Sequence, residues 1–285
     1  MKGFLFLFSF LIITSCTKIE DVLVGGNTHP TDLTIENTVI ENYVNKLYIS
    51  TIGREPNPAE FDANFETLRT ANLSQESREE VISAILNKEE YYNNLFKLES
   101  ANILNGVDTA MINERYYLYK YFLMNSTGFD SIYIAYEFER LAVLKQALPD
   151  LNAETITNTE LYERMVNNIF FDEINMGTEN FVVAMFQNFM LRYPTTAELE
   201  SGKLMVNDNN STLFFIAGNG KNDFINIFFA SDEYYTGQTN ILFNRYLFRN
   251  PTSEESVNYS LDYLNTDDYK VLQKRILSTD EFIGL

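Results

Sequence analysis

The sequence contains no tryptophan, one cysteine and one histidine, and these absences exclude several classes of site. The single cysteine, Cys16, cannot form an internal disulfide or a cysteine-based zinc site. With one histidine, His29, the chain has no Ser-His-Asp or Cys-His arrangement and no histidine-rich zinc site. Walker loops, dinucleotide fingerprints and Gly-x-Ser-x-Gly elbows are also missing. We therefore expect a protein that is not an enzyme and that holds no cofactor and no metal.

Basic residues are scarce, since 21 Lys and Arg stand against 40 Asp and Glu, for a formal net charge of -19 at pH 7. Nucleic acid binding needs clustered Lys and Arg that release counterions, and the sequence has no such cluster. The chain nevertheless has 45% hydrophobic residues over 285 positions, enough to bury one large core or two smaller ones. We expect a folded, acidic body that binds no nucleic acid.

The N-terminus has the pattern of a secretory signal, which we assign to residues 1–15. Met1-Lys2 is a short basic start, and residues 3–14 are almost wholly apolar but too few to cross a bilayer. This run leads into Ile13-Thr14-Ser15-Cys16, which resembles the lipobox of bacterial lipoproteins. The resemblance implies cleavage before Cys16 and attachment to a membrane through lipid on Cys16, with two or more acyl chains for stable anchoring.

Residues 16–34 are expected to be a flexible lipidated tether, because they contain Gly25-Gly26 and His29-Pro30 but few large apolar side chains. The segment Thr17-Lys18-Ile19-Glu20-Asp21 resembles the signals that send Bacteroidetes lipoproteins to the outer face of the outer membrane. A plain polar tether is the alternative interpretation. The expected location is the outer membrane, with exposure at the cell surface left open.

An internal repeat occupies much of the remaining chain. In three segments an aromatic residue lies six positions before an Arg, a Pro two positions after it and a Glu six positions after it. Each copy also has a later segment that ends in an acidic residue followed by an aromatic one. We assign the repeats to residues 35–100, 176–236 and 237–285. The repeated Arg and Glu residues are Arg54, Glu60 and Glu90, then Arg192, Glu198 and Glu233, then Arg249, Glu255 and Glu281.

The local chemistry of the repeat predicts a helix, a tight turn and a second helix. Pro stops the first helix, and Asn57, Thr195 or Thr252 then begins the next helix as a capping box with the Glu three residues later. A further amphipathic helix follows. The Arg side chains are expected to bond helix-end carbonyls or the acids of their own repeat, with ligand binding as the alternative.

Residues 101–175 show no clear copy, and we interpret them as a helical middle region. Helices are predicted around Tyr116–Phe122, over 132–148 and over 161–171, whereas no convincing strand pattern is found. Asp208 and Asp267-Asp268 lack EF-hand spacing and are expected to be solvated loop acids. The predicted fold is all-α, a helical repeat or bundle with three related copies.

The segment from Tyr48 to Arg54, with Pro56, Glu60 and the closing Glu90-Tyr91, resembles an uncharacterised bacterial domain with a Gly-Arg-x-Pro turn, which is distantly similar to phycobilisome linker domains. The Arg-x-Pro-Thr-x-x-Glu segments at Arg192 and Arg249 are also similar to segments of cytochrome-associated proteins of planctomycetes. Neither resemblance implies a known catalytic site.

Three functions follow as hypotheses. The leading one is a non-catalytic scaffold or accessory subunit that binds an envelope protein, because repeats, abundant aromatics and missing catalytic sets favour it. The alternative is a glycan-binding accessory lipoprotein of a polysaccharide uptake system, which needs exposed tyrosines in a groove with convergent Asn and Asp. The third is a carboxylate-based hydrolase, which needs a pocket with two acids of opposed protonation states.

Overall fold

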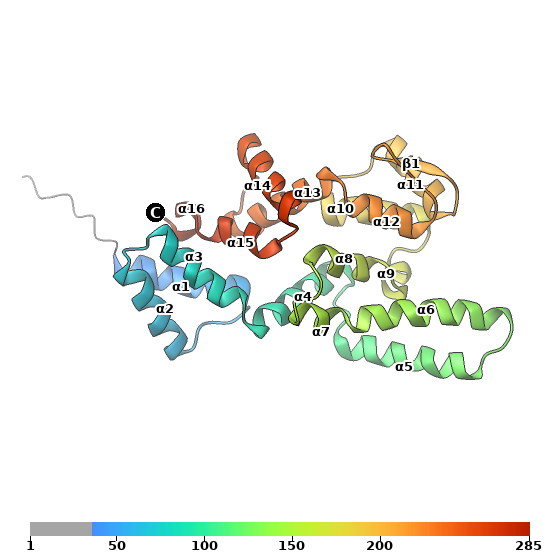
Figure 1. The fold of residues 1–285 in the computed structure, drawn as a ribbon, viewed down its shortest axis with the longest axis horizontal. Helices are drawn as coiled ribbons and strands as arrows, with labels where there is room; N and C mark the ends of the chain where they lie inside the picture. Colours follow the sequence, from blue (N-terminus) through green and yellow to red (C-terminus); the bar gives the residue numbers. More distant parts are fainter. Residues whose placement is uncertain (1–35) are drawn as a thin grey trace, which may run out of the picture. The chain divides into compact units, whose positions relative to one another are not determined.

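Helices make up nearly all of the regular structure in residues 36–285, the part of the chain that the computed structural model describes (Figure 1). The all-α fold expected from the sequence is therefore confirmed. The predicted signal sequence and the predicted tether, with Cys16 and His29, lie outside the described residues.

The three repeats contain the same succession of helices: one that ends just before the Arg, one that begins after the Pro, and a third. The first repeat consists of α1 (Asn37–Thr51), α2 (Pro58–Thr70) and α3 (Gln75–Leu86). The second contains α10 (Thr178–Met190), α11 (Thr196–Val206) and α12 (Lys221–Phe229). The third contains α13 (Asp232–Leu247), α14 (Ser253–Thr266) and α15 (Tyr269–Leu277), after which α16 (Asp280–Ile283) ends the described chain.

The turn between the first two helices has one geometry in all three repeats. The side chains of Asn57, Thr195 and Thr252 each accept the backbone N–H three residues on, and the Glu at that position bonds back, so the predicted capping boxes are present. The residue before each Arg has a positive φ, 80° at Gly53, 54° at Leu191 and 55° at Phe248. Leu and Phe are strained in this left-handed region of backbone conformation. The contacts around the turn must therefore stabilise it.

The middle region contains α4 (Glu89–Ile103), α5 (Thr109–Asn125), α6 (Phe129–Lys145), α7 (Ala147–Asn152) and α8 (Asn158–Val166), and α9 (Ile169–Ile174) follows. Two predicted helices are interrupted. The one expected over 161–171 breaks at Asn168, whose side chain accepts the N–H groups of Phe170 and Phe171 and so starts α9. The one expected over 132–148 divides at Gln146, between α6 and α7.

The repeat boundaries placed at 100/101 and 236/237 fall inside single helices, α4 and α13. Glu90-Tyr91 and Glu233-Tyr234 therefore do not close a repeat but begin the first helix of the next group. The residue after the acid is buried in each case, as Tyr91, Tyr234 and Phe282. Each of these groups is thus joined to the following helix by a two-residue turn, as at Asn87-Lys88 and at Ala230-Ser231.

The middle region has helices in the same roles as the other three groups, although the repeated sequence motifs are missing from it. Helix α4 plays the part of the first helix, α8 that of the third, and the segment between them is enlarged to α5, α6 and α7. At the start of α9, Asn168 caps the helix as Thr279 caps α16, and Phe171 is buried as Phe282 is. Phe170 stands where the other copies have Glu, so the ionic signature of the repeat is lost here.

The four groups pack into an array that closes on itself. Helix α1 contacts α4 and α10 contacts α13, while α3 contacts α15 and α8 contacts α12. The halves before and after Asn168 therefore use equivalent helices to contact each other, which indicates a duplicated pair of groups. Helix α16 completes the closure against α1, where the Tyr43 hydroxyl donates to the Leu277 carbonyl at 3.0 Å and the Tyr43 and Phe282 rings meet edge to face.

A short antiparallel hairpin was not expected from the sequence. Strands β1 (Ser211–Leu213) and β2 (Ile216–Gly218) pair between α11 and α12, joined by Phe214 and Phe215. Both turn residues have positive φ, 49° and 65°. A two-residue hairpin turn of this kind normally contains Asn-Gly or Asp-Gly, and neither pair is present here. Phe214 is held by packing near Phe186 and Phe228, and this tertiary contact replaces the missing local signal.

Candidate functional sites

Each repeated Arg is at the centre of a cluster with the two repeated Glu residues. Arg54 donates to Glu60 through Nη1 at 2.7 Å and to Glu90 through Nη2 at 2.6 Å. In the third repeat, Arg249 reaches Glu255 at 2.7 Å and Glu281 at 2.6 Å, and Arg192 pairs with Glu198 and Glu233 in the same way. The acids that the sequence analysis assigned to each Arg are therefore its partners in the structure.

The remaining repeat residues complete the cluster. In each copy Nη1 also donates to the carbonyl of the next residue, and the aromatic residue six positions earlier lies under the guanidinium, at 5.7 Å in Tyr48, 4.8 Å in Phe186 and 5.3 Å in Phe243. The Glu that accepts from Arg also accepts the N–H of the helix cap, at 2.6 Å for Thr195 and 2.7 Å for Thr252. One guanidinium thus joins the ends of three helices.

The electrostatics of the clusters favour a structural role. The hydrogen bond from Arg192 lowers the pKa of Glu198 to about 2, and the hydrogen bond from Arg249 does the same for Glu255. The pKa of Glu60 is also lowered, first by Arg54. These carboxylates are already bonded to protein donors, so they offer little to a ligand and cannot act as proton donors near neutral pH.

Replacing Arg192 with Met is expected to lower the free energy of unfolding at neutral pH by about 1–3 kcal/mol, because two carboxylates lose their charged donor. The folded pKa of Glu198 lies below its ordinary value of about 4.3. Its contribution is therefore complete above that value and is lost as the pH falls toward about 2. Denaturant unfolding measured across this interval should show a shallower acid dependence in the variant.

The matched control is Arg69→Met, which removes an Arg paired only with Glu66 on the surface of α2. An exposed pair of this kind is expected to contribute little. Equal losses from the two substitutions would contradict a special role for the repeated cluster.

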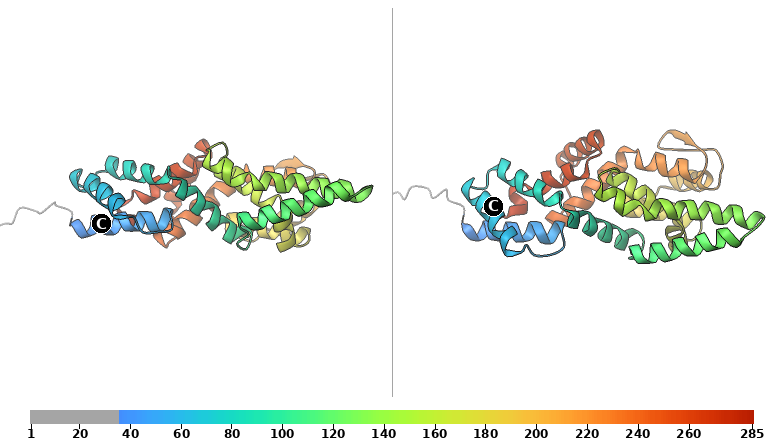
Figure 2. Two further views of the ribbon diagram at one scale, coloured as in Figure 1. Left: turned by 90° about the horizontal axis from the view of Figure 1, so that it is seen from below. Right: turned by 60° about the horizontal axis from the view of Figure 1, so that its bottom comes forward.

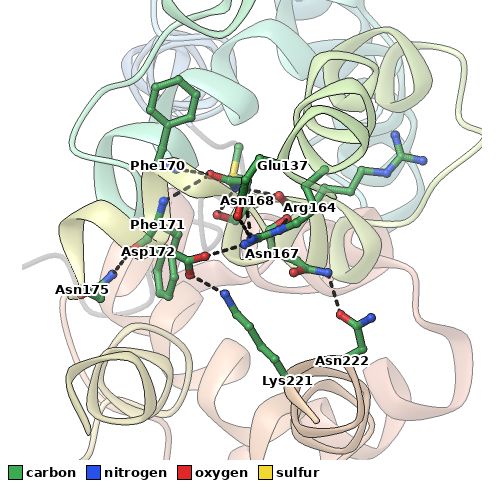
Figure 3. A network of polar contacts seen from close by, with 12 residues as sticks. Glu137, Arg164, Asn167, Asn168, Phe170, Phe171, Asp172, Asn175, Lys221 and Asn222 are labelled. Carbon is green, nitrogen blue, oxygen red and sulfur yellow. Dashed lines mark hydrogen bonds and ion pairs between the residues drawn. The ribbon is translucent and has the colours of Figure 1, made fainter. Parts of the chain in front are cut away.

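A second ionic cluster joins α6, α9 and α12 (Figure 3). Arg140 donates to Glu137 at 2.9 Å and to Asp172 at 2.6 Å, and Lys221 also pairs with Asp172. The side chains of Glu137 and Arg140 are 5% and 8% exposed, and burial raises the pKa of Glu137 and lowers that of Lys221. The two negative charges of the cluster are balanced by its two positive charges. These ion pairs hold α6 against α9 and α12. Sequence reasoning had no local signal for it.

The hairpin formed by α5 and α6, called here the apolar hairpin (residues 109–145), carries an unusual surface. Its two helices contact each other along their length. Helix α6 packs on α7, α8 and α9, and Arg115 of α5 also pairs with Glu173 of α9 at 2.7 Å. Figure 2 shows the tip of the hairpin reaching beyond the neighbouring helices. Large hydrophobic side chains are exposed along it: Met111, Tyr117, Leu118, Tyr121, Phe122, Met124, Ile132, Tyr133, Tyr136 and Val143.

Within residues 36–285 no group of three or more His, Cys, Asp or Glu side chains is arranged to hold a metal ion. No helix of this part of the chain has the length and apolar character needed to cross a membrane. The aspartates expected to be solvated are instead engaged at α14 and α15: Asp267 accepts from Thr159 at 2.6 Å, and Asp268 caps α15. That expectation was wrong for these two residues.

Comparison with known proteins gave no match to a family model, to a curated protein or to a solved structure. The resemblances to lipoproteins, to the Gly-Arg-x-Pro domain and to cytochrome-associated proteins therefore stay predictions.

Proposed function

We propose that this chain is a lipid-anchored protein of the outer membrane, without catalytic activity, which binds a protein partner of the cell envelope through the apolar hairpin. The exposed side chains of the hairpin carry the proposal. Tyr121 and Ile132 are 62% and 66% exposed, and Met124 is 77% exposed. Clustered Tyr, Phe and Met side chains are typical of the energetic centres of protein interfaces.

The charge of the hairpin also favours a protein partner. Residues 109–145 contain four acids and four bases, Glu114, Asp130, Glu137 and Glu139 against Arg115, Lys120, Arg140 and Lys145, so their formal charges cancel. The chain as a whole has a net charge of -19. The hairpin is therefore a neutral, aromatic surface on an acidic protein, and a partner can approach it with less repulsion than elsewhere.

The placement of the hairpin is consistent with a tethered protein. In Figures 1 and 2 its tip lies at the opposite end of the described unit from the start of α1, where the folded body begins. Lipid on Cys16 would hold the chain through the segment before α1. The hairpin would then be presented away from the anchored end, with the buried cluster around Arg140 fixing its base.

Photo-crosslinking in cells tests the proposal directly. A photoreactive amino acid replaces Tyr121 in one variant and Tyr193 in another, because Tyr193 is 70% exposed but lies outside the hairpin. We expect a discrete envelope protein to be crosslinked from position 121 and not from position 193. The double variant Tyr121→Glu, Ile132→Glu should lose this partner on affinity purification, whereas Tyr193→Glu should keep it.

Three results would count against the proposal. The first is equal crosslinking from both positions or none from position 121. The second is a native detergent extract in which the protein migrates alone. The third is binding of the unlipidated chain to protein-free vesicles that is abolished by the double hairpin variant, which would assign the hairpin to a lipid surface.

A further inference from the structure

The two long sides of the apolar hairpin differ, because one of them is held against α9. On this side Arg115 of α5 pairs with Glu173 of α9 at 2.7 Å. Arg140 of α6 pairs with Asp172 of the same helix at 2.6 Å. Both helices of the hairpin therefore turn these arginines toward α9. The side of the hairpin that faces away from α9 is called here the outer side.

The outer side of α5 carries large, exposed side chains. Successive residues are about 100° apart round a helix. Tyr117 and Met124 lie two and nine positions after Arg115, which places both about half a turn away from it. They are 57% and 77% exposed, and Tyr121, which lies between them at helical spacing, is 62% exposed. Tyr117, Tyr121 and Met124 are called here the α5 row.

The outer side of α6 carries short side chains instead. Ser131 lies nine positions before Arg140 and Ala142 two positions after it, so both are about half a turn away from this arginine. Ala135 follows Ser131 by four positions and continues the same row. All three are half-buried. Another helix can approach α6 closely along this row, because no long side chain stands in its way.

The large and the short side chains lie at the same height along the hairpin. Tyr116 of α5 stacks on Phe138 of α6, with their ring centroids 4.9 Å apart. Because α5 and α6 are antiparallel, Ser131 and Ala135 then lie level with positions 119–123 of α5. These positions fall within the span of the α5 row. The outer side thus presents a bulky half and a short half next to each other.

The outer side also has about the area that a stable interface needs. Its large apolar side chains are the α5 row and Ile132, which follows Ser131 on α6 and is 66% exposed. With about 150–250 Å² for a large side chain, these exposed fractions amount to on the order of 500 Å² of apolar surface. About 57% of a typical interface is non-polar. The polar rim therefore brings the outer side to about 800 Å², the area that each partner of a stable complex buries.

A second copy of this chain fits such a surface. The formal charges of residues 109–145 cancel, whereas the whole chain has a net charge of -19, so two copies repel each other least at their hairpins. In a twofold dimer each contact occurs twice, with the roles of the two copies exchanged. A twofold axis along the hairpin sets α5 of each copy over α6 of the other. The bulky half of each outer side then meets the short half of its partner.

We propose that the apolar hairpin pairs with the hairpin of a second copy of this chain, outer side against outer side, in a bundle of four helices. The inference rests on the proposed function, because it names the partner of the same hairpin. If lipid on Cys16 holds two copies in one membrane, their hairpins point the same way, as the twofold axis along the hairpin requires. The α5 row of each copy then packs on Ser131 and Ala135 of the other.

Crosslinking between two tagged copies tests the pairing. Copies with different affinity tags are expressed together, and only one of them carries a photoreactive amino acid, at position 124 or at position 111. Met111 is 48% exposed but lies one helical turn before Arg115, on the side that faces α9. We expect the product from position 124 to carry both tags and to be joined within residues 131–142 of the other copy. Position 111 should give little of this product.

Filling the space above Ala135 should prevent the pairing. We expect the purified, lipidated wild type to be a dimer with a dissociation constant in the micromolar range or tighter, as measured by native mass spectrometry. Ala135→Trp should weaken this dimer about tenfold or more. Ala59→Trp, at an exposed alanine of α2, is the matched control and should dimerise as the wild type does. Tyr121→Glu provides a second variant, because its side chain is exposed and the fold does not depend on it.

The outcomes separate this inference from the proposed function. Crosslinks from positions 121 and 124 to a different protein only, with a purified chain that is monomeric, would overturn the pairing and leave the proposed function in place. No crosslink from either position would overturn both. Equal amounts of product with both tags from positions 111 and 124 would also overturn the pairing, as would dimers of Ala135→Trp and Tyr121→Glu as stable as those of the wild type.

Discussion

Replacing Gly237 with alanine is expected to destabilise the protein by about 3 kcal/mol or more, because the added methyl group would overlap backbone atoms of a neighbouring helix. Gly237 lies in α13 where this helix crosses α10, and a Cβ atom there would be 2.1 Å from the Phe189 carbonyl oxygen and 2.8 Å from the Met190 Cα. These are backbone atoms, so a rotamer change cannot relieve the overlap. The two helices would have to separate, which weakens the contact between the second and third repeats.

Denaturant unfolding of the wild type and Gly237→Ala measures the effect. Gly202→Ala is the matched control, since Gly202 is also helical but its added Cβ would meet only side-chain atoms of Phe224 and Val182, at 2.9 and 3.0 Å. These side chains can shift, and alanine gains about 1 kcal/mol in helix propensity. The control should therefore lose much less stability. A Gly237→Ala variant as stable as the wild type would show that α10 and α13 are not packed this closely.

If lipid on Cys16 anchors the protein, as proposed above, replacing Cys16 with serine is expected to abolish membrane attachment completely. Cys16 is the only thiol of the chain, so no other residue can receive the thioether-linked lipid. The unlipidated protein should move from the membrane fraction to the fraction released by osmotic shock, or should keep its uncleaved signal. Fractionation and intact-mass analysis distinguish these forms, because lipidation adds the mass of the acyl chains.

Thr17→Ala provides the control for the Cys16 variant, because it alters the neighbouring residue and leaves the thiol in place. It should fractionate with membranes as the wild type does. Membrane association of Cys16→Ser at the level of the wild type, with an unchanged mass, would remove the lipoprotein interpretation and the tethered part of the proposed function.

The repeated clusters could be predicted because their information is local. The Arg, the capping residue and the first Glu lie within six positions of one another, and Pro and the capping box fix the turn between them. The second Glu is distant in sequence but recurs in each copy, as Glu90, Glu233 and Glu281. The pairing of each Arg with its distant Glu could therefore be predicted from the repetition, although no single copy indicates it.

The middle group keeps a capping residue but lacks the Arg, the Pro and the Glu of the other turns. Its turn between α4 and α5 uses Asn105 and Gly106 with positive φ, without Arg or Pro, although Asp108 still caps the next helix. The enlarged segment between α4 and α8 also displaced the later motif. The turn between α4 and α5 has two consecutive residues with positive φ, whereas each of the other three has one, directly before its Arg, so it differs in backbone conformation as well as in sequence.

The exposed hairpin was beyond sequence reasoning for a different reason. The aromatic residues of α5 have the composition of a core helix. They form a surface because no other part of residues 36–285 covers them.

The closure of the array through α16 sets the order in which the body can fold. Helix α1 is the first helix of the described residues, but its Tyr43 and Lys46 donate to the carbonyls of Leu277 and Phe282, more than 230 positions later. The core around α1 is therefore incomplete until α15 and α16 have folded against it. Contacts of such long sequence separation slow folding. The packing of α1 is therefore expected to be completed late in folding.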